Sequence, residues 1–456
     1  MENVVTNYSE SLIREYARPA PRYTSYPTAP HFSENIQHAQ VRSWMMGIPE
    51  QGGISIYIHI PFCDRLCWFC GCHTKHTLKY EPVKNYLQTL YAEMRLTAQI
   101  IGRRQNIRHL HLGGGSPSLL KAPELEELKA VLNECFTFST ETEISLEFDP
   151  TDLDSASLKA FAKFGITRAS LGVQDFDPRV QQSINRIQTF EQTKFVVDTL
   201  RDYGVTSLNI DALYGLPYQS LETLERTLVY VDALQPDRIA LFGYAHVPWV
   251  KPHQKLIPDD SLPNNILRFK QARLAEGFFE TKGYTAIGID HFAKPTDSLA
   301  VAYRHQTVRR NFQGYTTDDC DTLIGFGVSS ISQYPQGYSQ NVKDTHSYKR
   351  AVEGGSLPIQ RGFAIGAMDI TTASAINELM CYFTLTSDRL RRSFGDRADL
   401  ILTRAERLAS EDMHGFFVKD GADFKITERG KPFTRTLTSA FDEYLKNNET
   451  RYSIAV

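Results

Sequence analysis

The chain has 456 residues, of which 41% are hydrophobic and 23% are charged, a composition typical of a globular protein with a large core. Its 50 Lys and Arg nearly balance its 53 Asp and Glu, so the formal charge of −3 gives no electrostatic reason to expect nucleic acid or an anionic membrane as a partner. No apolar run approaches the roughly 18 residues that span a bilayer, and the first residues lack the basic and apolar regions of a signal peptide. We therefore expect a protein of the cytoplasm.

The first 50 residues predict an irregular arm. A short helix fits residues 9–17, whereas the prolines between residues 18 and 28 prevent a helix from continuing. The arm either packs on the surface or takes part in function, and its residues alone leave both interpretations open.

From residue 54 onward, short apolar or β-branched runs alternate with longer amphipathic segments, which predicts repeated βα units. The predicted strands are 54–60, 107–112, 143–148, 168–173, 206–213 and 238–242, with a further run at 285–289. The predicted helices are 81–102, 121–136, 155–164, 189–204 and 220–234. Such units form a parallel sheet covered by helices, and the pattern fits either an open doubly wound sheet or a partial barrel.

After about residue 360 this alternation stops. The later segments 372–384, 386–394, 396–410 and 433–447 predict helices, and residues 419–427 predict a hairpin. We therefore predict an N-terminal arm (1–50), an α/β domain with an extension (51–360) and a mainly helical C-terminal domain (361–456).

The strongest chemical signal is a group of four cysteines directly after the first predicted strand. The chain has seven cysteines, and Cys63, Cys67, Cys70 and Cys72 form a CxxxCxxCxC pattern. An odd, clustered count in a chain without an export signal argues for metal or redox chemistry rather than disulfides. Structural zinc normally takes a second, distant pair of ligands, and the sequence offers only two nearby histidines, His73 and His76.

Dense local cysteines are typical of iron–sulfur clusters. Three thiolates from CxxxCxxC would leave one iron of a [4Fe–4S] cube without a protein ligand, free to bind and react with another molecule. Because Cys72 follows Cys70 by only two positions, joint ligation of one cube is geometrically awkward, and we favour Cys72 as a non-ligand. A closed cluster with Cys72 as the fourth ligand is the alternative.

A second signal is the glycine-rich run at residues 113–117, after the second predicted strand. Glycines permit unusual backbone angles and close approach to a ligand, and their backbone groups can bind ammonium, carboxylate or phosphate. The run is neither a GxGxxG fingerprint nor a P-loop. A plain tight turn is the alternative. The position of the run on the same sheet edge as the cysteines favours a functional role.

Polar residues also stand where later strands end, and ligands of parallel βα folds bind at that edge. They are Glu147, Asp149, Gln174, Asp175 and Asp211. Taken singly, each fits a helix cap, a turn or a salt bridge equally well. Residues 244–248 and the adjacent Arg309 and Arg310 are weaker candidates for site residues. The two arginines would suit a polycarboxylate substrate, although adjacent arginines commonly face water. Arg186 alone predicts a solvated surface charge.

Taken together, the motifs resemble the radical S-adenosylmethionine superfamily, and within it the oxygen-independent coproporphyrinogen III oxidase (dehydrogenase) family. The resemblance is ordered and spans nearly the whole chain, through residues 21–29, 57–62, 63–72, 113–117, 147–150, 172–176, 209–217, 290–292 and 310–317.

This resemblance implies a partial (β/α)₆ barrel with an N-terminal arm and a helical C-terminal domain. It also implies that Cys63, Cys67 and Cys70 ligate a [4Fe–4S] cluster and that Cys72 does not. Two S-adenosylmethionine molecules are expected, bound by Tyr57, Phe69, Gly114, Gly115, Ser116, Glu147, Gln174, Arg186, Asp211, Ala245 and Ile331. Most family members carry Thr where this chain has Ser116, and the hydroxyl is retained.

The implied activity is the oxidative decarboxylation of two propionate side chains of coproporphyrinogen III, giving protoporphyrinogen IX for haem biosynthesis without O₂. An electron donor such as flavodoxin or ferredoxin is then needed as a partner, and we expect a monomer. The alternatives are a haem chaperone built on the same barrel, a radical enzyme acting on another tetrapyrrole, and a zinc-stapled interaction protein. Such chaperones usually lack the CGC ending and the arm at residues 22–29, both of which occur here.

Overall fold

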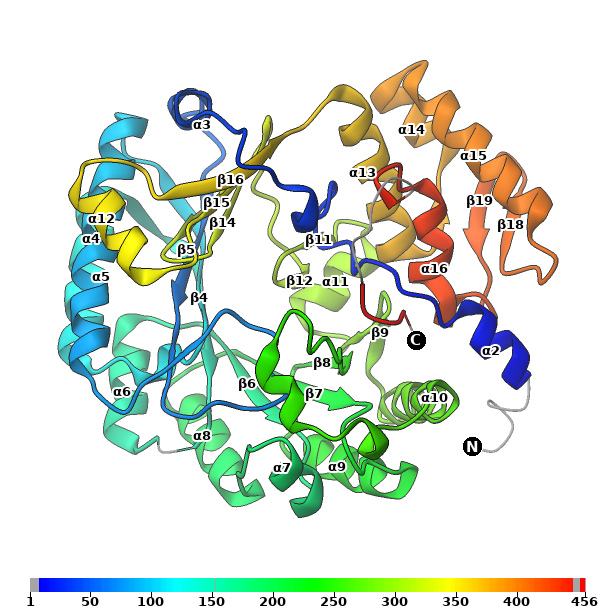
Figure 1. Cartoon of the computed structure of the whole chain (residues 1–456), viewed down its shortest axis with the longest axis horizontal. Coiled ribbons are helices and arrows are strands. Elements are labelled where there is room, and N and C mark those ends of the chain that lie inside the picture. Colours follow the sequence, from blue (N-terminus) through cyan, green and yellow to red (C-terminus); the bar gives the residue numbers. More distant parts are fainter. Residues whose placement is uncertain (1–7, 152, 446–451, 456) are drawn as a thin grey trace.

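The computed structural model describes residues 8–151, 153–445 and 452–455. Six parallel strands follow one another in chain order within a large sheet (Figure 1): β1 (Ile54–Ile60), β4 (Asn106–Gly114), β5 (Thr137–Phe148), β6 (Arg168–Gln174), β7 (Ser207–Tyr214) and β8 (Arg238–Gly243). A doubly wound sheet reverses its strand order at a switch point, whereas these strands never do. The partial barrel is therefore confirmed, and the open doubly wound alternative is wrong.

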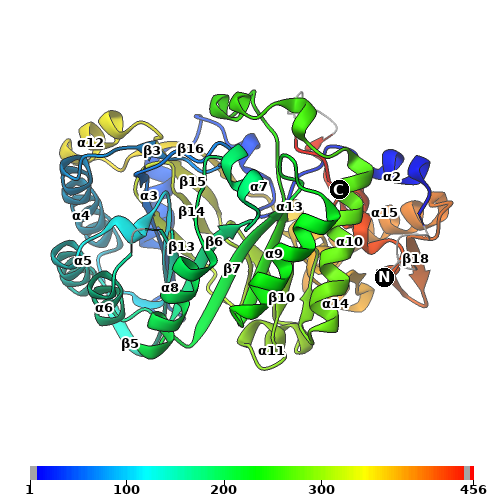
Figure 2. The same cartoon turned by 90° about the horizontal axis from the view of Figure 1, so that it is seen from below.

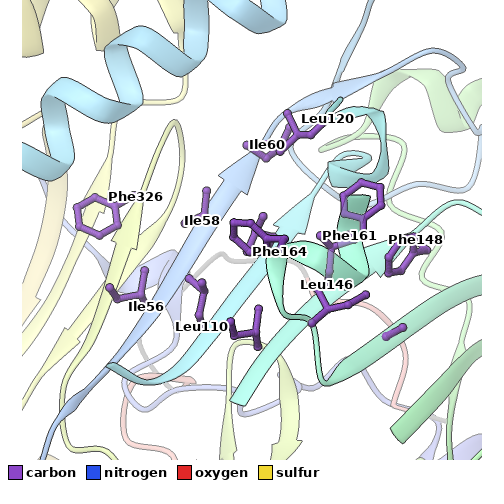
Figure 3. Close-up of a cluster of buried hydrophobic side chains, with 14 of the residues drawn as sticks. Ile56, Ile58, Ile60, Leu110, Leu120, Leu146, Phe148, Phe161, Phe164 and Phe326 are labelled. Atoms are coloured by element: carbon purple, nitrogen blue, oxygen red, sulfur yellow. The ribbon is translucent and has the colours of Figure 1, made fainter. Parts of the chain in front are cut away.

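Five amphipathic helices cover the outer face of these strands (Figures 1 and 2): α4 (Glu81–Ile101), α5 (Ala122–Cys135), α6 (Ser155–Phe164), α8 (Phe190–Asp202) and α9 (Leu221–Ala233). All five agree with the predicted segments to within two residues at each end. Between sheet and helices lies a core of alternate strand residues such as Ile56, Leu110 and Leu146, with Phe161 on α6 (Figure 3). This core fixes which strand residues face the opposite way, into the barrel.

Short strands, most of them antiparallel to their neighbours, extend both edges of the parallel sheet. Beside β1 lie β13 (Leu323–Phe326), β14 (Ile331–Tyr334), β15 (Gly337–Asn341) and β16 (Ile359–Ala364), of which only β13 runs parallel to its barrel neighbour β1. Beside β8 lie β10 (His291–Ala293) and then β9 (Thr285–Ile287). The run predicted at 285–289 thus does extend the sheet, and within the described residues the outermost strands β9 and β16 leave it unclosed.

Further helices and one hairpin complete this part of the chain. They are α7 (Pro178–Ser183), α10 (Asn265–Thr281), α11 (Ser298–Arg304), α12 (Thr345–Glu353) and the hairpin of β11 (Arg309–Asn311) and β12 (Gly314–Thr316). None of the described helices is long and apolar enough to cross a bilayer.

The C-terminal part consists of α13 (Ala367–Tyr382), α14 (Ser387–Phe394), α15 (Arg397–Glu411), α16 (Thr434–Thr438) and a small sheet of β17 (Thr384–Leu385), β19 (Asp423–Ile426) and β18 (Phe417–Asp420). The predicted hairpin is confirmed as β18 and β19. The predicted helix 433–447 is wrong in extent, since α16 is followed by one 3₁₀ turn that ends before Asp442. The Asp442 carboxylate accepts hydrogen bonds from the Tyr444 N–H and the Tyr23 hydroxyl, and this competes with helix continuation. Residues 446 and 447 lie outside the described part.

The N-terminal arm contains more helix than its sequence predicts. Besides α2 (Glu10–Tyr16), which was expected, α3 (His38–Met46) forms in a segment that we predicted to be irregular. Leu12, Ile13 and Tyr23 of the arm are buried in the same apolar cluster as α13 and α15. The arm therefore packs against the C-terminal part, and the proposed division into three domains remains a prediction.

Candidate functional site

The cysteine loop, residues 61–72, leaves the carboxyl end of β1. Cys67 is buried, and Cys63 and Cys70 are half-buried. Distant side chains fix this loop by donating hydrogen bonds to its backbone carbonyls: Asn185 to Leu66 (2.8 Å), Gln254 to Phe69 (2.9 Å), His253 to Cys70 (2.8 Å) and Lys251 to Cys72 (2.7 Å). Sequence reasoning missed all four, and no local spacing relates them to cysteines more than one hundred residues away.

Arg186 is the charged partner of the cysteine loop. Its Nη1 lies 3.6 Å from the Cys67 sulfur and 3.0 Å from an Asp149 carboxylate oxygen, and its Nη2 donates to the Gly172 carbonyl at 2.7 Å. Its side chain is only 9% exposed, so the solvated surface charge predicted from its neighbours in sequence is wrong. The strand ends of β5 and β6 supply enough acceptors to bury the guanidinium beside a thiol.

The donor set of this loop fits an iron–sulfur cluster better than a zinc ion. Burial raises the pKa of the Cys63 and Cys67 thiols, so both would need a metal centre to be held as thiolates near neutral pH. Thiolates that share one tetrahedral zinc lie about 3.8 Å apart, as Zn–S bonds of about 2.3 Å require. In the described chain, the group whose three ligand atoms all lie within 4.8 Å is His109, Asp318 and Asp319, not the cysteines. The three cysteine sulfurs do not all meet that limit, which disfavours one shared zinc, whereas in a cube each thiolate would bind a different iron.

The glycine-rich loop, residues 113–117, packs against the end of β1 and the start of the cysteine loop. The N–H groups of Gly115 and Ser116 donate to the carbonyls of Ile60 and Phe62, both at 2.8 Å, and the Gly114 N–H donates to Glu147 at 3.1 Å. A Cβ at Gly115 would lie 2.6 Å from the Phe62 carbonyl oxygen, so only glycine permits this contact. Because these N–H groups are already used, the loop offers a ligand carbonyl oxygens, which suit ammonium rather than carboxylate or phosphate.

Two carboxylates inside the barrel mouth make the site negative. Glu147 on β5 accepts a hydrogen bond from His111 at 3.1 Å, and although burial raises its pKa, the contacts with His111 and Gly114 outweigh burial and lower it. Asp211 on β7 accepts from Ser170 at 3.0 Å and Asn209 at 2.7 Å. Burial and then the charge of Glu147 raise the pKa of Asp211 to about 6. A cationic ligand would be stabilised between these groups.

The remaining predicted residues lie around the same mouth. Tyr57 on β1 stacks on His111 and is paired in the sheet with Gly325. A Cβ at Gly325 would lie 2.5 Å from the Ile331 carbonyl oxygen, so Ile331 lies next to this pair of strands. Gln254 joins the backbone carbonyls of Phe69 and Ala245. Gln174 ends β6 in the left-handed region with φ of 67°, a conformation that non-glycine residues adopt rarely and often at functional sites.

The structure thus brings the predicted site residues to one edge of the sheet. The adjacent Arg309 and Arg310, in contrast, lie in different surroundings. Arg309 is 49% exposed and pairs with Asp321, as expected for a surface cation. Arg310 is buried, with 3% of its side chain exposed. Asp175, expected at the mouth, is instead fully buried, where it accepts hydrogen bonds from Gln219 and Thr227. Asp175 therefore stabilises the fold behind the site.

Comparisons with known proteins agree with this geometry. Residues 57–231 match the family model of the Radical SAM superfamily. The chain is 42% identical over 424 residues to an oxygen-independent coproporphyrinogen III oxidase of Paracoccus denitrificans, covering 93% of this chain and 94% of that protein. A protein of the same name from Cereibacter sphaeroides is 43% identical over 95% of this chain and 96% of its own. The solved structure of coproporphyrinogen III oxidase from Escherichia coli, described as a radical SAM enzyme, superposes with a TM-score of 0.89 at 35% identity over 96% of this chain and 99% of that one.

Proposed function

The chain belongs to the family of oxygen-independent coproporphyrinogen III oxidases within the radical SAM superfamily, and on this premise we propose its reaction, its cofactor ligands and its partners. The enzyme converts two propionate side chains of coproporphyrinogen III to vinyl groups and so forms protoporphyrinogen IX in haem biosynthesis. The observation that carries this function is the set of three cysteines on one loop at the mouth of the partial barrel, with Arg186 beside Cys67.

Cys63, Cys67 and Cys70 would hold a [4Fe–4S] cluster, and Cys72 would remain a non-ligand. When bound, the cluster supplies the electron that cleaves S-adenosylmethionine to methionine and a 5′-deoxyadenosyl radical. The Arg186 guanidinium offsets the negative charge of the thiolates, while Asn185, His253 and Gln254 hold the loop backbone in place. These contacts would thereby hold a bound cluster at the end of the barrel.

We assign S-adenosylmethionine to the residues around the mouth, and two molecules of it. Two groups of these residues support that number. The first group lies on β1, β4, β5 and the extension beside β1, and consists of Tyr57, Gly114, Glu147 and Ile331. The second group lies on or after β6, β7 and β8, and consists of Gln174, Arg186, Asp211 and Ala245, with Phe69 beside Ala245. Gly115 and Ser116 belong with the first group. The carbonyls of the glycine-rich loop and the Glu147 carboxylate would orient a cationic methionine moiety.

On the substrate, a hydrogen atom passes from the β-carbon of a propionate to the adenosyl C5′. CO₂ then leaves, and one electron passes to an external electron acceptor, which gives the vinyl group. The protein has to hold this carbon close to the adenosyl C5′ and exclude water and O₂. The Tyr57 ring, which stacks on His111 beside Glu147, supports this role. The electron donor is a small redox protein such as flavodoxin or ferredoxin, and the enzyme acts as a monomer in the cytoplasm.

Anaerobic turnover of reconstituted protein with reductant, S-adenosylmethionine and coproporphyrinogen III tests this function. We expect 5′-deoxyadenosine, methionine and a divinyl product, and a Cys67→Ala variant serves as the negative control. Absence of vinyl product from protein with an intact cluster would refute the oxidase. Haem binding without formation of deoxyadenosine would instead favour the haem chaperone.

A further inference from the structure

The segment that follows the cysteine loop, residues 73–80, folds back onto it at the protein surface. The Thr77 N–H donates to the Cys63 carbonyl at 2.9 Å, and the exposed His76 pairs with Cys63 in a short parallel strand pair. Paired strands lie about 5 Å apart, so one strand spacing separates His76 from the backbone of a proposed cluster ligand. A molecule that bound to this segment would therefore come close to the cluster.

Lysines are concentrated on and beside this segment. Lys75 and Lys79 lie on it and are exposed. The exposed Lys343 adjoins it, because its carbonyl accepts a hydrogen bond from His73 at 2.8 Å. Lys251 donates to the end of the cysteine loop at 2.7 Å. Among the described residues, none of these four lysines, which we call the lysine patch, forms an ion pair with a carboxylate.

Two helix N-termini add to the positive charge of the lysine patch. α4 begins at Glu81, two residues after Lys79, and α12 begins at Thr345, two residues after Lys343. The N-terminus of a helix carries the equivalent of about half a positive charge. The backbone and the lysines therefore create a positive potential at the same place.

The carboxylates beside the lysine patch compensate this charge only in part. They are Asp64 on the cysteine loop, Glu81 and Asp344. Glu81 and Asp344 lie at the two helix starts, where Asp344 accepts a hydrogen bond from the Ser347 N–H at 2.6 Å, so the helix ends offset their charge. The local excess is positive, although the formal charge of the whole chain is −3.

Exposed apolar side chains accompany the lysines. Leu78, next to Lys79, is 82% exposed, and Trp249 and Val250, directly before Lys251, are 50% and 60% exposed. A protein partner can bury such side chains within a charged rim, and apolar or aromatic anchors provide much of the affinity of protein interfaces. These side chains favour a protein partner over a small anion.

We propose that the lysine patch, with Leu78 as an apolar anchor, is the docking surface for a small one-electron carrier protein whose face around its redox group is acidic. This inference rests on the proposed function and names where its electron donor binds. The carrier is oxidised by one electron and the cluster is reduced by one, and no bond forms or breaks. Opposite charges on the two faces would steer their association and fix their orientation.

Isothermal titration calorimetry of reconstituted protein with an acidic flavodoxin, and in a second series with an acidic ferredoxin, tests the proposal. We expect Lys75→Glu and Lys343→Glu each to raise the Kd of the carrier about 10-fold at about 0.05 M salt and less at about 0.3 M, because salt screens exposed charges. Leu78→Ala should raise the Kd about 10-fold at both salt concentrations, since apolar burial depends little on screening.

Lys159→Glu is the matched control, because Lys159 is exposed on α6, away from the cysteine loop, and its Kd should equal that of the unmodified protein. Iron content and the midpoint of thermal unfolding show whether each variant is assembled. Reduction of the cluster by dithionite, which needs no docking surface, should proceed equally in all variants. Reduction by the reduced carrier should be slower in Lys75→Glu and Lys343→Glu.

An unchanged Kd in folded Lys75→Glu and Lys343→Glu protein, an equal rise in Lys159→Glu, or no binding of either carrier to the unmodified protein would overturn the docking surface. A raised KM for coproporphyrinogen III in dithionite-driven turnover, with an unchanged Kd for the carrier, would instead assign the lysines to the substrate and also overturn it. If the unmodified protein forms no vinyl product with dithionite, the proposed function itself fails, whatever the carrier binds.

Discussion

The guanidinium of Arg186 lies 3.6 Å from the sulfur of Cys67, although the two residues are 119 positions apart. Its other contacts, to Asp149 and the Gly172 carbonyl, hold it there with little exposure to solvent. A positive charge so close to Cys67, the proposed cluster ligand, would stabilise the reduced, more negative form of a bound cluster.

Arg186→Gln should therefore make the reduction potential of the cluster more negative, by about 60 mV, which corresponds to a tenfold change in the reduction equilibrium. An anaerobic redox titration followed by electron paramagnetic resonance measures this shift. Arg226→Gln is a suitable control, because Arg226 pairs with Asp177 and is 63% exposed. Equal potentials in the two variants would contradict a charge effect of Arg186.

Cys67→Ala should abolish the cluster, whereas Cys72→Ser should leave the iron and sulfide content unchanged. Cys67 is buried beside Arg186, while Cys72 is exposed at the end of the loop. Chemical analysis of iron and sulfide after reconstitution gives the result directly. Equal loss in both variants would refute ligation by three cysteines.

Gly115→Ala should weaken binding of S-adenosylmethionine about 10-fold while iron content is retained. The added Cβ would lie 2.6 Å from the Phe62 carbonyl oxygen and 2.8 Å from the Pro61 carbonyl carbon, and backbone atoms cannot rotate away. Equilibrium dialysis measures the affinity. Gly277→Ala is the control, since Gly277 lies inside α10 with open space around it and should stabilise the fold by about 0.5–1 kcal/mol. If Gly115→Ala and Gly277→Ala bound S-adenosylmethionine equally well, the glycine-rich loop would tolerate the added Cβ, which would contradict this prediction.

Asp297→Asn should lower the free energy of unfolding by about 3–5 kcal/mol, because it leaves Arg238 buried without its partner. The two side chains are 4% and 9% exposed and lie 2.5 Å apart at the amino end of the barrel strands. In contrast, Asp388→Asn breaks an exposed pair with Arg392 and should cost less than about 1 kcal/mol. Urea unfolding compares the variants, and similar losses would argue against the importance of burial.

Glu143→Gln should destabilise the protein near neutral pH and lose this effect in acid. Burial alone would raise the pKa of Glu143, but His109, whose Nδ1 lies 3.7 Å from a Glu143 carboxylate oxygen, and the charge of Arg168 lower it to about 2. A carboxyl with a depressed pKa stabilises the fold above its usual value of 4.5 and loses this contribution as the pH falls towards 2. Urea unfolding at several pH values should therefore show a difference between variant and unmodified protein that shrinks below pH 4.5.

Glu141→Gln on the same strand provides the control for that experiment, because Glu141 is exposed. It should match the unmodified protein at each pH. A difference that stays constant across the acid range for Glu143→Gln would contradict the ionic role of Glu143.

Much of the barrel could be predicted because burial on both faces of a parallel strand leaves a continuous apolar run, as in the segment that became β1. The cysteine and glycine-rich loops were also visible, since each follows such a run and uses neighbouring residues. Ends of elements were less certain: Asp442 stops a segment with helical periodicity through contacts with a residue of the arm.

The supports of the site could not be predicted, because they act over long separations in the chain. Asn185, Lys251 and His253 donate hydrogen bonds to backbone carbonyls of the cysteine loop, and carbonyls carry no signal in the sequence. Arg309 and Arg310 are identical in type and adjacent, yet one is exposed and the other buried, because successive residues of β11 face opposite sides.

The two ends of the chain are tied together across the molecule. The Tyr23 hydroxyl donates to Asp442, and Arg435 donates to the Pro21 carbonyl, contacts that span 419 and 414 positions. The ribosome synthesises the barrel and its cysteine loop before it synthesises Arg435 and Asp442. The arm can therefore form these two contacts only near the end of translation. Delivery of iron and sulfide to the nascent protein can therefore precede the docking of the segment that carries Arg22.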